Sequence, residues 1–312
     1  MAVRPSILEQ GDTIGIVTLG SPLGPMVINR GIQTLENFGF NVVLGKNVYA
    51  ATGFLAGSPE ERAVDLMNMF ENNTVKMILP TRGGVGVDGI LPFLDYDVIR
   101  NNPKIISGYS DITTLLNTLT QMSNLITFHS LLLLDFRPST PAYNYNQFFS
   151  ATSVVLPSRV IENPQGIPQT SVIPGNVTGT IVGGNLTSLI SSLGTPYEID
   201  TEGKILFLED THEPTNTIYR YLNMLKLAGK FDDCVGIVMG ECTNCPNAYN
   251  TSYADLINGV IAPLGKPLMT NVTTGHGYYK AAIPIGARAN LNTVNNTFTV
   301  LEPTVSLSAM NI

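Results

Sequence analysis

The chain has 312 residues, long enough for two hydrophobic cores, and only 13% of them are charged, about half of the roughly 25% usual in soluble domains. With 44% hydrophobic residues, it is not a disordered, highly solvated chain. The formal net charge of −7 and the lack of clustered Lys and Arg argue against a nucleic-acid partner, because phosphate contacts need such clusters.

The N-terminal stretch MAVRPSILEQGDTIGIV has no charged leader followed by a long apolar segment, so we expect no signal peptide. The most apolar window, LITFHSLLLLDF (125–136), is far shorter than the roughly 20 residues that span a bilayer. Three cysteines are an odd number and too few for a disulfide scaffold. We therefore expect a soluble, cytoplasmic protein that does not interact with membranes.

The first half of the chain alternates short apolar runs with helical patterns. The predicted buried strands are 13–17, 42–45, 76–80, 104–108 and 125–128. Predicted helices lie between the first three strands, and one of them opens with Ser58, Pro59 and Glu61, a capping box with proline at the first helical position. This alternation predicts the α/β class, with a mostly parallel sheet covered by helices on both faces.

The character changes between Arg137 and Asn176, where six prolines occur with little helical period. This composition predicts a linker or crossover between two domains. We place the N-terminal domain at 1–150, the linker at 151–175 and the C-terminal domain at 176–312.

The second half again predicts strands and helices. Residues 177–194 suggest a strand, a glycine turn and a helix, and the alternation over 283–303 suggests paired strands. Further strands are predicted at 204–209, 234–240 and 266–272. The C-terminal domain is therefore expected to be rich in β-structure.

The stretch KIISGYSDITTLL (104–116) carries the first candidate for chemistry. An apolar run stops at Gly-Tyr-Ser, and an amphipathic helical pattern starts at once. Ser110 or Asp111 could simply cap that helix. Alternatively, Ser110 could be a nucleophile on a sharp strand-to-helix turn, where the next backbone N–H helps to hold an oxyanion. The Gly-x-Ser-x-Gly form is not met, because Ile112 replaces the second glycine, so both interpretations stay open.

A serine nucleophile needs a base, normally histidine, and the chain has three. His129, inside ITFHSLLLL, is predicted to be a satisfied core residue, and His212, between carboxylates, a surface residue. His276 lies between two glycines just beyond a predicted strand, where α/β folds tend to place their chemistry. His276 is the candidate base, although a structural role is equally compatible with this position.

The histidine in turn needs a carboxylate that fixes its tautomer. KILFLEDTHEP (204–214) offers Glu209, Asp210 and Glu213. Glu209 follows four apolar residues at a semi-buried strand end, where a carboxylate is costly unless it is paired. Asp210 and Glu213 are predicted to lie in the turn and at the start of the next helix. Glu209 is therefore the candidate acid.

The glycines of PTRGGVGVDG (80–89) directly follow a predicted strand and let the backbone approach a ligand closely. Neither the Walker nor the Gly-x-Gly-x-x-Gly spacing of phosphate loops is present. The segment could supply an oxyanion donor opposite the Asp111 N–H, or it could be a plain tight loop.

Cys242 and Cys245 form a Cys-x-x-Cys pair, with Cys234 upstream. A structural zinc site would need a fourth ligand at a matching spacing, and none stands out. We therefore expect no metal and no cofactor, and the role of the pair stays open.

Five motifs occur along the chain: TRGGVGVDGILPFLDYDVIRNNPKIISGYSDIT, ITFHS, GGNLTSLISSLGTPYE, ILFLEDTHEPTNTIYRYLNML, and GHG followed by IPIGARANL. Through these motifs the chain resembles the LD-carboxypeptidase family of serine peptidases, which contains the muramoyltetrapeptide carboxypeptidases and, as relatives, microcin C immunity peptidases. Each motif alone is weak, but they occur in the family's order from about Gly11 to about Thr299.

The resemblance implies roles for single residues. Ser110 corresponds to the nucleophile of the family's Gly-[Tyr/His]-Ser-Asp motif, Glu209 to the acid and His276 to the base. The oxyanion hole would be formed by the backbone N–H groups of Gly84 and Asp111.

Two further residues, Arg82 and Tyr109, are candidates for substrate binding by position alone, and an ordinary salt bridge of Arg82 is an equal alternative. Relatives often have TFHGPM where this chain has TFHSLL, so the wall near Ser130 is expected to differ.

The family resemblance also implies the architecture and the reaction. It implies an N-terminal domain like the class I glutamine amidotransferases, a smaller β-rich C-terminal domain, and a homodimer. The expected reaction is metal-free release of the terminal D-alanine from murein tetrapeptide during cytoplasmic cell-wall recycling. Two alternatives are a microcin C-type peptidyl or aminoacyl nucleotide as the substrate, against which the absence of tryptophan counts mildly, and a non-catalytic muropeptide-binding protein.

Overall fold

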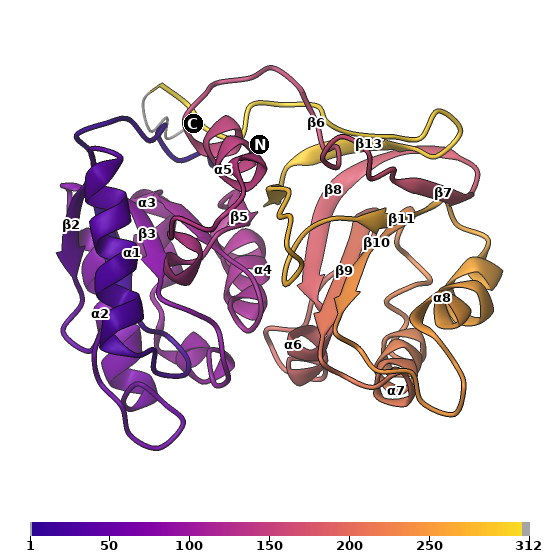
Figure 1. Ribbon diagram of the computed structural model, residues 1–312, viewed down its shortest axis with the longest axis horizontal. Helices are drawn as coiled ribbons and strands as arrows, with labels where there is room; N and C mark the ends of the chain where they lie inside the picture. The colour runs from indigo at the N-terminus through magenta and orange to yellow at the C-terminus, as the bar shows by residue number, and fades with distance from the viewer. Residues whose placement is uncertain (1, 308–312) are drawn as a thin grey trace.

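A six-stranded sheet in the order β12-β5-β4-β3-β1-β2 forms the N-terminal half of the molecule (Figure 1). The computed structural model describes residues 2–307. The parallel strands are β1 (Thr13–Val17), β2 (Asn41–Leu44), β3 (Val75–Pro80), β4 (Ile105–Gly108) and β5 (Thr127–His129). A strand from far along the chain, β12 (Ile283–Ile285), joins the edge antiparallel to β5. The predicted mostly parallel sheet is confirmed.

Helices cover both faces of this sheet, because successive residues of each buried strand point to opposite sides. Ile105 belongs to the core that includes α1 and α5, whereas Ile106 belongs to the core that includes α2, α3 and α4. These helices are α1 (Pro25–Asn37), α2 (Pro59–Glu71), α3 (Tyr96–Asn101), α4 (Ile112–Ser123) and α5 (Ala142–Thr152), with 3-10 turns η1 (Asp88–Phe93) and η2 (Leu133–Asp135). The capping box of α2 is confirmed, since Ser58 and Glu61 exchange two hydrogen bonds.

The C-terminal half is a curled mixed sheet in the order β6-β14-β13-β8-β9-β10-β11-β7. Its central strands β8 (Asn176–Asn185), β9 (Ile205–Thr211), β10 (Gly236–Thr243) and β11 (Leu268–Val272) run parallel. The flanking strands are antiparallel: β6 (Arg159–Val160), β7 (Thr170–Ile173), β13 (Arg288–Asn292) and β14 (Thr297–Val300).

One face of this second sheet packs on helices, and the other packs toward the first sheet. Leu206 and Leu208 share a core with α6 (Leu186–Ser191), α7 (Thr215–Leu227) and α8 (Tyr253–Leu256), which η3 (Ile257–Ile261) and η4 (Ala262–Leu264) continue. Phe207 instead shares a core with Phe128 of β5. Hence β9 is buried on both sides at the junction between the two halves. None of the helices in the part of the chain that the structure describes is long and apolar enough to cross a membrane.

Two stretches differ from the sequence-based prediction. Between 137 and 176, where little helical period was expected, the chain forms α5 and the short edge strands β6 and β7. Over 283–303, β13 and β14 pair as predicted, but β12 pairs with β5 of the other sheet. Alternation of apolar residues reports which side of a strand is buried, and it does not report which strand lies beside it.

Close packing of α1 on η2 generates the first prediction. A Cβ added at Gly31 would lie 2.7 Å from Leu133 Cγ and 2.8 Å from its carbonyl oxygen, whereas one at the exposed Gly259 would meet nothing within 4 Å. We expect Gly31→Ala to lower the free energy of unfolding by about 1–2 kcal/mol, because overpacking outweighs the gain in helix propensity. Gly259→Ala should raise it by about 0.5 kcal/mol. Urea denaturation of both variants checks this; equal effects would contradict the packing described here.

Candidate active site

Ser110 lies on the sharp turn between β4 and α4, here called the elbow (residues 108–111). Its φ of 62° is left-handed, a conformation that non-glycine residues rarely adopt and that clusters at functional sites. The Thr113 N–H donates to the Ser110 carbonyl oxygen at 2.9 Å and keeps the turn closed. No side-chain hydrogen bond from Asp111 caps α4, and Ser110 Oγ forms none within the described residues. The cap interpretation of the elbow is therefore not supported.

The glycine loop (residues 81–87) follows β3 and lies directly against the elbow. A Cβ at Gly83 would come within 2.8 Å of both Ser110 Cβ and the Asp111 backbone nitrogen, so only glycine fits there. The Val87 N–H donates to Asp111 Oδ2 at 2.8 Å and joins the loop to the elbow. Within residues 2–307, the backbone N–H groups of Gly84 and Asp111 donate to no protein acceptor. Two backbone donors are therefore left free on facing segments.

Arg62 of α2 binds the same loop through its guanidinium group. It is only 1% exposed, and its guanidinium donates to the carbonyl oxygens of Gly86 at 2.7 Å, Gly57 at 3.2 Å and Leu19. Burial lowers the pKa of Arg62, while the nearby charge of Asp111 opposes that change. Burial raises the pKa of Asp111 to about 6, although the hydrogen bond from Val87 acts to lower it.

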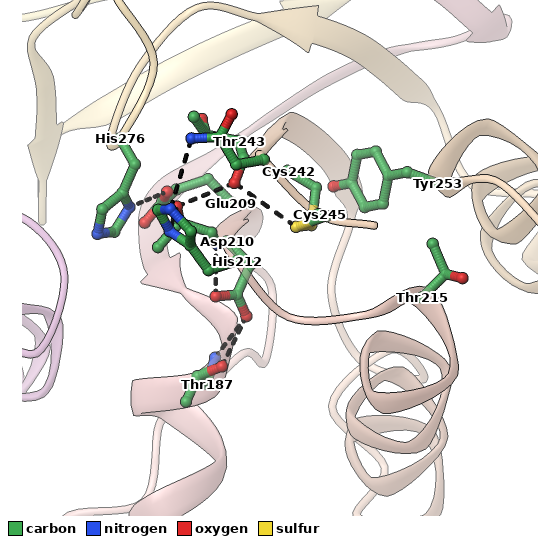
Figure 2. Close-up of a disulfide and its surroundings, with 12 residues drawn as sticks. Thr187, Glu209, Asp210, His212, Thr215, Cys242, Thr243, Cys245, Tyr253 and His276 are labelled. Atoms are coloured by element: carbon green, nitrogen blue, oxygen red, sulfur yellow. Dashed lines mark hydrogen bonds and ion pairs between the residues drawn. A yellow bond between two sulfur atoms is a disulfide. The ribbon is translucent and has the colours of Figure 1, made fainter. Parts of the chain in front are cut away.

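Glu209 and His276 form a direct hydrogen bond across the second sheet (Figure 2). Glu209 Oε2 lies 2.9 Å from His276 Nδ1, and the two side chains are 0% and 17% exposed. Burial alone would raise the pKa of Glu209, but the hydrogen bond and charge of His276 bring it below its ordinary value. A Cβ at Gly275, which has a φ of 73°, would lie 2.3 Å from Glu209 Oε2. The carboxylate therefore fills the space beside the histidine.

Tyr109 connects the elbow with the histidine. Its ring meets the His276 ring edge-on at 4.9 Å between centroids, and its hydroxyl donates to Asp135 Oδ1 at 3.3 Å. Within the described residues Ser110 Oγ forms no hydrogen bond with His276, so the elbow contacts the histidine through the Tyr109 ring. Catalytic hydrogen bonds are often long before a substrate binds. The structure thus pairs Glu209 with His276 and places Ser110 one residue from a direct contact with that pair.

The other two histidines form no hydrogen bond with Glu209 or His276. His212 is exposed, as predicted. His129 is a core residue, but the expectation of a satisfied histidine is wrong, because neither ring nitrogen has a hydrogen-bond partner. Burial lowers the pKa of His129 to about 4.

Asp210 was expected in a turn and lies instead within β9, 2% exposed. It accepts hydrogen bonds from Asn185 Nδ2 at 3.2 Å and from Thr187 N and Oγ1 at 3.0 and 2.8 Å (Figure 2). Burial raises its pKa to about 6 despite these donors. Asp210 therefore ties the start of α6 to β9.

The sequence reasoning did not single out Glu241 or Lys280. Glu241 Oε2 is buried without a hydrogen-bond partner, and a Cβ at Gly277 would lie 1.8 Å from it. Lys280 is 7% exposed in the loop that carries His276. The available signal for Lys280 was a lone charge in front of the apolar run AAIPI.

The structure also shows the contacts of the Cys-x-x-Cys pair and of Arg82. Cys242 and Cys245 are joined in a disulfide at the end of β10, beside β9 (Figure 2). Arg82 is half-buried in the glycine loop and forms no hydrogen bond or ion pair with any residue between 2 and 307. The ordinary salt bridge considered for Arg82 is therefore not found.

The sequence and the fold are both similar to those of known proteins. The family profile described as LD-carboxypeptidase N-terminal domain matches residues 14–130, and that described as LD-carboxypeptidase C-terminal domain matches 178–291. The chain is 38% identical over 316 residues to a probable murein peptide carboxypeptidase of Bacillus subtilis (strain 168), covering 98% of this chain and 97% of that protein. It is 29% identical to a murein tetrapeptide carboxypeptidase of Pseudomonas aeruginosa (89% and 92% covered). A structure of the microcin C7 self-immunity protein MccF superposes with a TM-score of 0.91 at 26% identity, covering 97% and 100%.

The left-handed elbow gives a prediction about stability. We expect Ser110→Gly to have a free energy of unfolding about 1 kcal/mol higher than Ser110→Ala, because glycine adopts a φ of 62° without the steric cost of a Cβ. Urea denaturation of the two variants checks this. A more stable alanine variant would show that the turn is not strained.

The buried His129 gives a prediction about pH. The unfolded chain protonates this histidine near pH 6.5, whereas the folded chain does so only near 4, so the folded state loses stability as the pH falls between these values. From pH 7 to 4.5, we expect the free energy of unfolding of His129→Phe to fall by about 2 kcal/mol less than that of the wild type. Equal pH dependence in urea titrations would contradict a neutral buried His129.

Proposed function

The chain belongs to the LD-carboxypeptidase family of hydrolases, and we propose that it is a serine carboxypeptidase that releases the terminal D-alanine of murein tetrapeptide by hydrolysing an L–D bond. The observation that carries this proposal is the full-length likeness to a probable murein peptide carboxypeptidase, at 38% identity. The hydrogen-bonded Glu209–His276 pair, which contacts Tyr109 directly before the left-handed Ser110, supports the mechanism.

In this proposal Ser110 Oγ attacks the carbonyl carbon of the scissile bond while His276 Nε2 takes the hydroxyl proton. The tetrahedral intermediate collapses, the imidazolium gives its proton to the leaving amine, and D-alanine departs. The remaining peptide is then an ester on Ser110. Water, activated by the same histidine, hydrolyses the ester and regenerates the serine.

Glu209 acts on His276 alone. The 2.9 Å hydrogen bond requires the proton on Nδ1, which leaves Nε2 free to act as the base. Because Glu209 is fully buried and its pKa is below its ordinary value, it stays ionised and stabilises the imidazolium.

The oxyanion is held by the backbone N–H groups of Gly84 and Asp111. Their lack of a protein acceptor supports this role, because donors aimed at developing charge must be free before the substrate binds. The hydrogen bond from Val87 to Asp111, together with the Arg62 brace on Gly86, keeps the two segments in place.

Arg82 is the proposed partner of the substrate's terminal carboxylate. Its guanidinium has no counter-charge among the described residues, and it precedes Gly83, which touches the elbow. A free, half-buried arginine suits bidentate binding of a carboxylate. Tyr109 is a weaker candidate for substrate binding, because its hydroxyl is already bonded to Asp135.

A second candidate function has its own support, namely the TM-score of 0.91 to the microcin C7 self-immunity protein. The same residues could hydrolyse a peptidyl or aminoacyl nucleotide. The chain lacks tryptophan for stacking a nucleobase, although its 12 Tyr and 12 Phe could serve. A non-catalytic muropeptide-binding role is disfavoured by the paired acid and base.

Three other features of the proposal rest on the family resemblance: a place in cell-wall recycling, a homodimer, and an N-terminal domain like the class I glutamine amidotransferases. The proposed cytoplasmic location and the division at 1–150, 151–175 and 176–312 rest on the sequence pattern.

A mass-spectrometric assay on murein tetrapeptide, beside a microcin-type adenylate, tests the proposal. We expect the wild type to release D-alanine, and Ser110→Ala and Glu209→Gln each to be slower by about 10⁴-fold, because the first removes the nucleophile and the second the tautomer control. Glu213→Gln, a carboxylate in the same segment without a hydrogen bond to His276, serves as the matched control and should keep wild-type rates.

Each outcome separates the alternatives. Tetrapeptide left intact by the wild type, with the adenylate cleaved, would favour the second candidate. Turnover by Ser110→Ala at the wild-type rate would disprove the mechanism.

A further inference from the structure

The loop that carries His276 (residues 273–280, here the histidine loop) has a glycine on each side of the histidine. Glycine is conformationally free, so this loop pays a large entropic cost to hold one shape. A Cβ at Gly275 would lie 2.3 Å from Oε2 of Glu209, which is buried and bonded to His276, so a larger residue there would displace the carboxylate. A Cβ at Gly277 would lie 1.8 Å from Oε2 of Glu241, and that side chain would have to move. The loop therefore needs a restraint from elsewhere.

Lys280 supplies such a restraint. Its Nζ donates to the Gly275 carbonyl oxygen at 2.6 Å and to the Gly277 carbonyl oxygen at 2.8 Å. These two carbonyls flank His276 on either side. Hydrogen bonds from a charged donor are roughly twice as strong as neutral ones. The ammonium group thus closes the loop around the histidine.

The same ammonium group also faces the elbow. Lys280 Nζ lies 4.0 Å from Asp135 Oδ1 and 4.6 Å from the centroid of the Tyr109 ring. Asp135 accepts the hydroxyl of Tyr109, and the Tyr109 ring contacts His276. Lys280 is therefore in contact both with the backbone that holds the base and with the residue that precedes Ser110.

A third contact anchors the loop to α5. Asn144 Oδ1 accepts from the Lys280 backbone N–H at 2.9 Å, and Asn144 Nδ2 donates to the Tyr278 carbonyl oxygen at 3.1 Å. Since the backbone of Lys280 is fixed in this way, its side chain reaches the two glycine carbonyls from a rigid base.

We propose that Lys280 is a positioning residue for the reaction: its ammonium group holds the carbonyls on both sides of His276, so that the imidazole keeps its contacts with Glu209 and Tyr109. The inference rests on the proposed role of His276 as the base. A misplacement of the base by about 1 Å costs on the order of 10²-fold in rate.

The chain offers a matched control in Lys104. This lysine is also 7% exposed, and its Nζ also donates to two backbone carbonyl oxygens, of Asn72 at 2.8 Å and Val75 at 2.6 Å. It directly precedes β4 (Ile105–Gly108), at the end of that strand away from the elbow. Lys104→Met therefore reports what the loss of a buried, structural ammonium group does by itself.

The experiment measures kcat and KM for D-alanine release by the full-length chain. We expect Lys280→Met to lower kcat about 10²-fold with KM changed less than about threefold, and Lys104→Met to leave kcat within about threefold of the wild type. Since Lys280→Met leaves Asp135 without its counter-charge, Lys280→Met/Asp135→Asn is measured alongside and should remain about as slow. Propylammonium, which replaces the missing atoms, should restore kcat of Lys280→Ala at least about fivefold over sodium chloride of equal ionic strength.

Two results would overturn the inference: a kcat of the double variant within about threefold of the wild type, or no rescue of Lys280→Ala by propylammonium. Failure of the proposed substrate is distinguishable. If the wild type leaves tetrapeptide intact, the rate at which a fluorophosphonate labels Ser110 takes the place of kcat, with the same expectations for each variant. A wild type that neither cleaves nor is labelled would overturn both the function and the inference.

Discussion

The hydrogen bond between the buried carboxylate of Glu209 and His276 is the interaction on which the rest of the site depends. A fully buried carboxylate is unstable without a partner, and His276 Nδ1 provides one at 2.9 Å. The Glu209 side chain also restricts which residues can lie beside it. A Cβ at Gly275 would come within 2.3 Å of this side chain, and one at Gly240 within 3.0 Å. The size of the Glu209 side chain therefore explains why glycine precedes the histidine, and this glycine is why the loop needs an external restraint. The hydrogen bond of Glu209 explains why the imidazole has a defined tautomer.

The other half of the site is held to this pair by contacts between distant segments. Asn117 of α4 exchanges two 2.8 Å hydrogen bonds with the backbone of Gly183 in β8, which lies beside β9. The helix that starts at the elbow is thereby fixed to the sheet that carries Glu209. The pairing of β12 with β5 joins the sheets a second time. The elbow that carries Ser110 and the sheet that carries Glu209 are thus fixed to each other at two places.

Much of this arrangement could be predicted from the sequence, and the failures share one cause. The parallel sheet, the capping box at Ser58 and the strand-to-helix turn at Ser110 depend on residues close together in the chain, so periodicity and spacing report them. Local patterns do not report contacts between distant segments. They therefore miss the lack of a hydrogen-bond partner at His129, and they miss the contacts of Lys280 with Tyr109 and Asp135. Asp210 was misplaced because β9 continues three residues beyond its apolar run, and Asp210 is held there by donors from Asn185 and Thr187.

The most direct test of the account is a crystal structure of Ser110→Ala with murein tetrapeptide bound. The account predicts the scissile carbonyl carbon beside residue 110, its oxygen within hydrogen-bonding distance of the Gly84 and Asp111 N–H groups, and His276 still bonded to Glu209. A tetrapeptide whose scissile bond lies away from residue 110, or which contacts only one of the two halves, would contradict it.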